Sequence, residues 1–92
     1  MPMAKRLEGQ KRGIGRESTY FHEFDHFSKR VRQNIGRLRQ TRRLTQEQME
    51  EYELNLRQFQ RIESGETVNM TLSYLFRIAK ALGVKPSQLL DV

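Results

Sequence analysis

The chain has no cysteine, so it can form neither a disulfide framework nor a thiolate metal site. Its longest apolar runs are only a few residues, too short to span a bilayer. No apolar segment follows the basic residues near its start, so we expect no secretory signal and a cytoplasmic location. It contains no G-x-S-x-G word and no phosphate-binding glycine loop, so we do not expect an enzyme.

What the chain does have is an excess of basic charge. Its 92 residues include 17 Lys and Arg against 11 Asp and Glu, which gives a net charge of +6. This length makes one small domain with little room for a second. The charge predicts a polyanionic partner.

The first 27 residues differ in texture from the rest. Residues 1–19 combine glycines and basic residues with almost no periodic apolar positions, which predicts a flexible basic arm. Tyr20, Phe24 and Phe27 follow at helical spacing, so this aromatic segment either extends the first helix or packs on the domain. We therefore divide the chain into an arm, residues 1–27, and a folded domain, residues 28–92.

Helical signals are regular from Ser28 onward. Val31, Ile35 and Leu38 recur at steps of four and three among many arginines, which predicts a basic amphipathic first helix capped by Ser28. No strand pattern competes, so we predict an all-α domain. Its expected core is Val31, Ile35, Leu38, Met49, Phe59, Ile62, Leu75, Ile78, Leu82 and Leu89.

Capping and stop residues mark four further helices. A polar cap begins a helix, a glycine ends one, and a proline fits the first helical position. These residues are Thr45 with Gln48, Asn55, Ser64-Gly65, Thr71, Gly83 and Pro86.

Residues 44–65 are the most informative stretch, because they predict two short helices joined by a tight turn. The second helix surrounds its apolar seam of Phe59 and Ile62 with Arg57, Gln58, Gln60 and Arg61. Arg and Gln make bidentate hydrogen bonds to guanine and adenine edges in the major groove. A short helix with such residues outward, braced by a preceding helix, is how a helix-turn-helix domain reads DNA.

The chain contains three sequence segments in this order: IGRLRQTRRLTQEQM, FQRIESG and TLSYLFRIAKALGVKPSQLL. Through them residues 31–92 resemble the phage-repressor, or Cro/cI-like (XRE), helix-turn-helix family. The resemblance implies a compact lambda-repressor-like domain of five helices. It also implies binding to operator DNA, usually as a symmetric dimer.

The sequence departs from the family pattern around the turn. Between Gln46 and Glu63 it is one residue shorter, and the loop after Gly65 is one residue longer. Glu50 stands where alanine is usual, and Glu53 stands where the turn glycine is usual. A non-glycine residue in left-handed geometry costs on the order of 1 kcal/mol. We therefore expect the shortened turn to use different dihedrals.

The resemblance places the family's base-reading positions on Leu56, Arg57, Gln58 and Arg61. Both arginines suit guanine, and Gln58 suits adenine. The alternatives are a solvated polar face for Arg57 and Gln58 and a phosphate contact for Arg61. Leu56 either touches a thymine methyl group or turns inward beside Met49.

Phosphate contacts are expected just before and at the start of the second helix. In the family, the residue at the position of Gln46 contacts a phosphate. The alternative interpretation is that Gln46 is an ordinary residue in the first turn of a helix and contacts no phosphate. Arg42 and Arg43 precede that helix and are expected to contact phosphates as well. We interpret Arg32 and Arg37 as solvated.

Arg39 and Glu63 occupy positions that form an internal ion pair in the family. We expect this pair to be structural and to link the first helix to the end of the third. Removing one partner of such a pair leaves the other charge buried without a partner, which destabilises the fold.

His22, Glu23 and His26 form an H-E-x-x-H sequence motif, which is typical of zinc proteases. A catalytic zinc also needs a third protein ligand and a substrate cleft, which a small basic domain does not offer. We therefore interpret the motif as a chance occurrence and expect no metal and no cofactor.

The function expected is sequence-specific binding of double-stranded DNA by a transcriptional regulator, most simply a repressor, acting as a homodimer. Residues 86–92, which include Leu89 and Leu90, are the expected dimer surface, with the aromatic segment as a second contribution. The basic arm is expected to add non-specific affinity. The competing hypotheses are a protein-interaction module, such as an antitoxin that binds a toxin through its arm, and, remotely, a zinc-dependent hydrolase.

Overall fold

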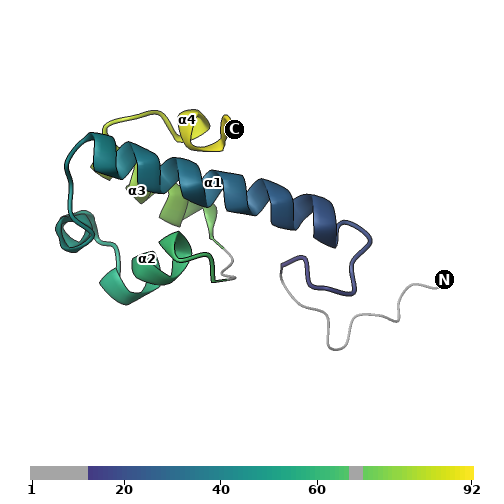
Figure 1. Ribbon diagram of the computed structural model, residues 1–92. Coiled ribbons are helices and arrows are strands. Elements are labelled where there is room, and N and C mark those ends of the chain that lie inside the picture. The colour runs from purple at the N-terminus through teal and green to yellow at the C-terminus, as the bar shows by residue number, and fades with distance from the viewer. Residues whose placement is uncertain (1–12, 67–69) are drawn as a thin grey trace.

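The computed structural model describes residues 13–66 and 70–92, and every regular element in those ranges is helical (Figure 1). In chain order the elements are α1 (Phe21–Thr41), the 3-10 helix η1 (Glu47–Tyr52), α2 (Leu56–Glu63), α3 (Leu72–Leu82) and α4 (Pro86–Leu90). The all-α prediction is confirmed. Across the described ranges no helix has both the length and the apolar character needed to cross a membrane.

The long helix α1 organises the molecule. Figure 1 shows α1 crossing the whole fold, with α4 above it and α2 below it, while its N-terminal half extends beyond the other helices. Residues 1–12 of the expected basic arm lie outside the described residues. The boundary expected after residue 27 falls inside α1.

The first helix begins at Phe21, seven residues before Ser28, the expected cap. Ser28 is therefore not a cap, because it lies inside α1 with its side chain buried. The aromatic segment extends the helix because Tyr20, Phe24 and Phe27 continue the apolar stripe of Val31 at steps of four and three. A continuous stripe of this kind favours helix across the serine.

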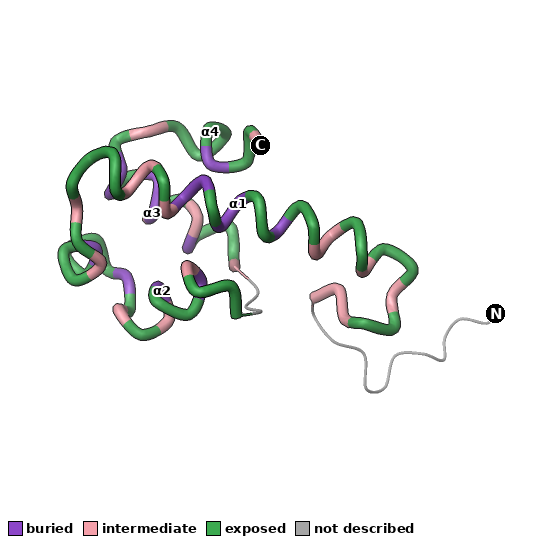
Figure 2. The backbone as a smooth tube through the Cα atoms, viewed as in Figure 1, coloured by how far each residue is buried: buried purple, intermediate pink, exposed green. Residues whose placement is uncertain are grey.

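The core lies between α1 and the four shorter elements (Figure 2). Eight of the ten expected core residues are buried, whereas Leu38 and Leu75 are only partly buried and pack against the outside of the cluster. Buried members that were not expected are Leu54, Tyr74, Ala79 and Ala81. Leu89 is fully buried, so it is not available to the dimer surface expected at residues 86–92.

The first helix of the helix-turn-helix motif, η1, is a 3-10 helix of six residues. A 3-10 helix rises about 2.0 Å per residue against about 1.5 Å in an α-helix. Six residues therefore cover about 12 Å, the span of about eight α-helical residues. This stretching compensates for the missing residue between Gln46 and Glu63.

The turn between η1 and α2 contradicts the expectation of different dihedrals. Glu53 adopts the left-handed conformation, with φ 63° and ψ 33°. Because η1 is stretched, the chain reaches the start of α2 with the same left-handed residue that a turn glycine would supply. Glu53 therefore carries a strain of on the order of 1 kcal/mol.

Apart from Ser28, the predicted caps at Thr45, Asn55 and Thr71 are confirmed. Thr45 and Gln48 form a reciprocal pair, in which the Gln48 N–H donates to Thr45 Oγ1 at 3.1 Å and the Thr45 N–H donates to Gln48 Oε1 at 2.7 Å. Asn55 Oδ1 accepts from the N–H of Gln58 at 2.9 Å, and this bond fixes the first turn of α2. Thr71, Gly65 and Gly83 also act as predicted.

Candidate nucleic-acid interface

The short helix α2 is strongly two-sided. Phe59 and Ile62 are completely buried and anchor it to the core. Arg57 and Arg61, one turn apart, are exposed on the opposite side. An apolar seam that cannot be exposed therefore dictates which side chains of α2 face outward.

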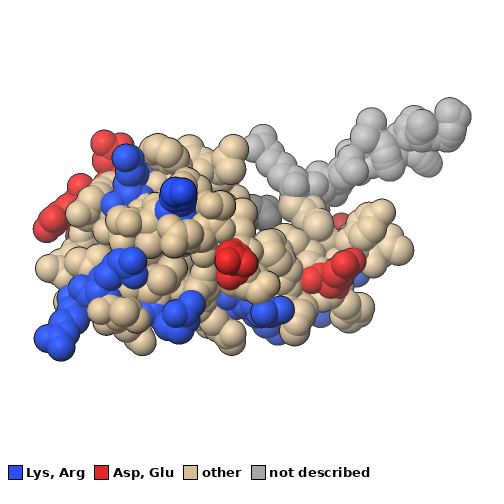
Figure 3. Space-filling view, turned by 90° about the horizontal axis from the view of Figure 1, so that it is seen from above, with Lys and Arg blue, Asp and Glu red and all other residues tan. Residues whose placement is uncertain are grey.

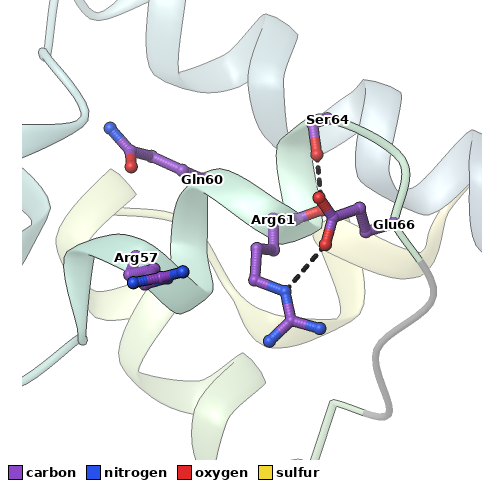
Figure 4. Close-up of a pocket in the computed structure, with 5 residues that line it drawn as sticks. All are labelled: Arg57, Gln60, Arg61, Ser64 and Glu66. Carbon is purple, nitrogen blue, oxygen red and sulfur yellow. Dashed lines mark hydrogen bonds and ion pairs between the residues drawn. The ribbon is translucent and has the colours of Figure 1, made fainter.

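The outward face of α2 borders a shallow polar hollow of about 490 Å³ (Figure 4). Arg57, Gln60 and Arg61 line it from the helix, and Ser64 and Glu66 line it from the segment that follows. Gln60 was noted as polar but not predicted to be a site residue. Glu66 was not anticipated at all, because it lies beyond the helix end and enters only through the turn at Gly65.

Arg61 and Glu66 form an exposed ion pair. Arg61 Nε donates to Glu66 Oε1 at 2.8 Å. The two terminal nitrogens of Arg61 make no hydrogen bond or ion pair with any residue that the structure describes, and Figure 4 shows them pointing away from the helix. The guanidinium is thus held at one nitrogen, while its outer edge remains available to a ligand.

The other two expected base-reading residues are less open. Gln58 is half-buried, and its backbone N–H is bound by the Asn55 cap. Leu56 is also half-buried, but it is not among the apolar side chains that pack against the core.

Arg39 and Glu63 form a two-point ion pair between α1 and the end of α2. Arg39 Nε and Nη2 donate to the two Glu63 carboxylate oxygens at 2.7 and 2.9 Å, and both side chains are about nine-tenths buried. These hydrogen bonds raise the pKa of the Arg39 guanidinium, and burial opposes them only in part. Arg39 Nη1 also donates to the Leu44 carbonyl at 2.6 Å, which ties the loop before η1 to the same pair.

Gln46 joins this network from the start of the motif. Its Nε2 donates to Glu63 Oε1 at 2.9 Å. An amide nitrogen carries two hydrogens, so one remains for a further acceptor. Gln46 is therefore part of the hydrogen-bond network of Arg39 and Glu63. Any contact of its side-chain nitrogen with a phosphate has to use the second hydrogen on Nε2.

Arg42 and Arg43 are both exposed at the end of α1. The Leu44 N–H donates to the Arg39 carbonyl, and the Arg43 N–H donates to the Gln40 carbonyl. This pair of hydrogen bonds is the Schellman motif of a helix C-terminus. Arg43 takes the left-handed position of this pattern at φ 58°, where glycine is usual. A strained backbone thus carries an exposed arginine immediately before η1.

Arg32 and Arg37 are not simply solvated, contrary to expectation. Arg32 is only 5% exposed, and its Nη1 donates to the Gly65 carbonyl at 3.3 Å. This places a cation at the C-terminal end of α2, where the helix dipole favours positive charge. Arg37 donates to the Asn34 side chain, whose Nδ2 donates to carbonyls of α4.

Basic side chains are numerous on the face shown in Figure 3, where they line the lower edge of the view with only scattered acidic residues between them. This is consistent with the net charge of +6. Such a surface attracts a polyanion before any specific contact forms.

The residues of the H-E-x-x-H motif, His22, Glu23 and His26, lie near the start of α1. His22 and His26 are exposed on α1, one turn apart. Within residues 13–66 and 70–92, no group of three or more His, Cys, Asp or Glu side chains gathers in a metal-binding arrangement.

Two short helices with an outward-facing basic second helix define a helix-turn-helix protein. The family model of the Cro/C1-type HTH DNA-binding domain matches residues 34–92, so the chain belongs to this family and carries a DNA-binding domain. No curated protein and no solved structure gives a significant match. Residues 21–33, the first part of α1, precede the family domain.

Proposed function

We propose that this protein is a sequence-specific, double-stranded DNA-binding transcriptional regulator, and most simply a repressor, that inserts α2 into the major groove. The observation that carries the proposal is the two-sidedness of α2, with Phe59 and Ile62 fully buried and Arg57 and Arg61 outward. The Arg39–Glu63–Gln46 network supports it, because it fixes the angle at which α2 is presented.

Base reading falls to the first turn and outer edge of α2. Arg57 and Arg61 each donate two hydrogen bonds to guanine O6 and N7, and Gln58 pairs with adenine. The bond from Arg61 Nε to Glu66 supports this role, because it restricts the guanidinium and leaves both terminal nitrogens for the base. Leu56 contacts a thymine methyl group.

Phosphate contacts come from Arg42, Arg43 and the free amide hydrogen of Gln46. Both arginines are exposed next to the motif, where they fix the register of the protein on the duplex without reading sequence. The helix dipole contributes little to phosphate binding at the N-terminus of η1, since η1 is a single short 3-10 helix. The side chains, rather than the helix end, are the anion ligands.

The proposal includes a homodimer that acts in the cytoplasm, without a metal, a cofactor or an enzymatic activity. A two-fold dimer presents two α2 helices to successive major grooves, about 34 Å apart. The competing hypothesis is a module that captures a protein through its arm, residues 1–27, of which residues 1–12 lie outside the described residues. No contact in the described residues favours it.

The test begins with selection of bound sequences from a random duplex pool by the full chain. Arg57→Ala is then compared with Arg42→Ala on the selected duplex and on a scrambled duplex at fixed salt. Arg57→Ala should weaken binding to the selected duplex about tenfold or more and relax one base pair per half-site, with little effect on the scrambled duplex. Arg42→Ala should weaken binding to both duplexes by a similar factor.

Lys85→Ala provides a matched control, because Lys85 is an exposed cation just before α4 and is not among the proposed contacts. It should leave the preference for the selected duplex unchanged. An equal loss on both duplexes for Arg57→Ala would show that Arg57 touches a phosphate. A pool that yields no preferred sequence would overturn sequence-specific binding altogether.

A further inference from the structure

An apolar groove of about 640 Å³ runs beside the N-terminal half of α1. Its apolar lining comes from Phe24, Phe27 and Val31 of α1, from Ile14 in the segment before α1, and from Met70, Leu75 and Leu90. Phe27 and Leu90 remain 43% and 41% exposed. Leaving large apolar side chains in water is unfavourable by about 25 cal/mol per Å², so the groove favours an occupant.

Most of the α1 side of this groove lies outside the family domain. Phe24, Phe27 and Val31 all precede residue 34, where the family match begins. Figure 2 shows this part of α1 as mainly exposed and intermediate, in contrast to the buried residues farther along the helix. The extension of α1 therefore has a surface that the DNA-binding fold does not itself use.

The spacing of the stripe identifies the kind of partner. Tyr20, Phe24, Phe27 and Val31 are separated by four, three and four residues, which is the spacing of the a and d positions of a coiled coil. Val31 is already buried by the core, whereas Tyr20 is 66% exposed. The open end of the stripe therefore suits a second helix with the same apolar spacing.

Charges beside the stripe make this surface complementary to itself. Glu23 and Arg30 both occupy g positions of that heptad, flanking Phe27, and neither forms an ion pair within the part of the chain that the structure describes. In an antiparallel pair of helices, g positions face each other across the apolar seam. Glu23 of one copy would then face Arg30 of the other, and the two-fold axis would repeat the contact.

We propose that two copies of this chain associate through the N-terminal half of α1, packed antiparallel in the groove. The contact is isologous, so each copy contributes the same aromatic stripe and the same pair of charges. Asp25 and Lys29 do not take part, because they already pair with each other at 3.1 Å along α1. This interface rests on the homodimer included in the proposed function. Its test uses no DNA, so it can fail without overturning sequence-specific DNA binding.

The first experiment is sedimentation of the full chain without DNA, over a range of concentrations. The wild-type chain should be a reversible dimer. Phe27→Ser should raise the dimer Kd by about tenfold or more, because it removes a central apolar side chain of the seam. Tyr52→Ser is the matched control, since Tyr52 is an exposed aromatic residue on η1 that does not line the groove, and it should leave the Kd unchanged.

The second experiment tests the antiparallel arrangement and does not depend on the folding of the Phe27 variant. Glu23→Arg and Arg30→Glu should each weaken the dimer, because each places like charges opposite one another. The double variant should restore it, since the two charges have merely exchanged places. A monomeric wild-type chain, a dimer insensitive to Phe27→Ser, or a double variant that dimerises no more tightly than the single variants would overturn the proposal.

Discussion

At the scale of single residues, Glu63 is the point on which the DNA-binding unit depends. It accepts hydrogen bonds from Arg39 and from Gln46, and thereby connects α1, the start of the motif and the end of α2. Charged groups buried to this degree are stable only when they are paired. The same residue therefore holds the fold together and orients the helix that is proposed to read bases.

Glu63→Gln should lower the melting temperature, because it keeps the shape of the side chain but leaves the Arg39 guanidinium without its countercharge. A loss of about 1–3 kcal/mol is expected for a hydrogen bond to a buried charge. For a domain of this size this loss corresponds to a decrease of roughly 4–24 °C in the melting temperature. Thermal unfolding followed by circular dichroism measures the change.

Glu66→Gln is the control for that experiment. Glu66 also accepts from an arginine, but both side chains of its pair are more than half exposed. Exposed pairs contribute little to stability, so the melting temperature should hardly change. Equal losses for the two variants would mean that burial of the Arg39–Glu63 pair is not what stabilises it.

At the scale of the helices, two of the connections depend on residues that are poorly suited to their backbone. Arg43 ends α1 and Glu53 follows η1, and both have positive φ without being glycine. The corresponding positions after α2 and α3 are Gly65 and Gly83. Only one of the two exceptions, Arg43, has a proposed function that explains it, namely a phosphate contact.

Arg43→Gly and Glu53→Gly should both stabilise the fold, because glycine adopts positive φ without steric cost. The gain should be about 0.5–1 kcal/mol, reduced by the greater entropy of glycine in the unfolded chain, or about 2–8 °C. Their effects on DNA should differ. Arg43→Gly should weaken binding to every duplex, whereas Glu53→Gly should leave binding unchanged.

Melting curves and binding titrations on the two glycine variants provide this comparison. Gly83→Ala, at φ +70°, is the reverse control and should lower the melting temperature. A lower melting temperature for Arg43→Gly would show that the arginine side chain holds the loop in place. The arginine would then have a structural reason to occupy a strained position.

Much of the helix pattern can be predicted from the sequence because its signals are local. Thr45, Asn55 and Thr71 cap the N–H groups of residues only three positions away, so the sequence alone contains both partners. The beginning of α1 could not be predicted in this way. Ser28 has the chemistry of a cap, but the apolar stripe that passes through it decides the conformation.

Several features that depend on packing between distant segments escaped prediction, although the family resemblance indicated the Arg39–Glu63 pair. Arg32 reads as one more surface arginine, yet the carbonyl it contacts is 33 residues away. Leu89 and Leu90 are equivalent in sequence, yet one is fully buried and the other is exposed. The outward face of α2 was predictable because Phe59 and Ile62 define its inner face, whereas the contribution of Glu66 depends on how the chain turns after the helix.

At the scale of the whole molecule, the net charge of +6 controls how strongly any duplex is attracted. Four of its cations, Lys5, Arg6, Lys11 and Arg12, lie in residues 1–12, outside the described residues. Arg42 and Arg43 belong instead to the folded part, next to the proposed groove contact. The two groups should therefore contribute in different ways to binding.

If the protein neutralises about four to six phosphates, the logarithm of the binding constant should fall against the logarithm of salt concentration with a slope of about −4 to −5. Replacing the four cations of residues 1–12 by glutamine should flatten this slope by up to about 0.9 for each phosphate that is no longer neutralised. The preferred sequence should stay the same, because phosphate contacts carry no sequence information. The measurement is a titration of the selected duplex at several salt concentrations, together with a new selection from the random pool.

An unchanged slope would show that these residues do not touch phosphates. A changed preference would show that they read bases, which would make residues 1–12 a second recognition element beside α2.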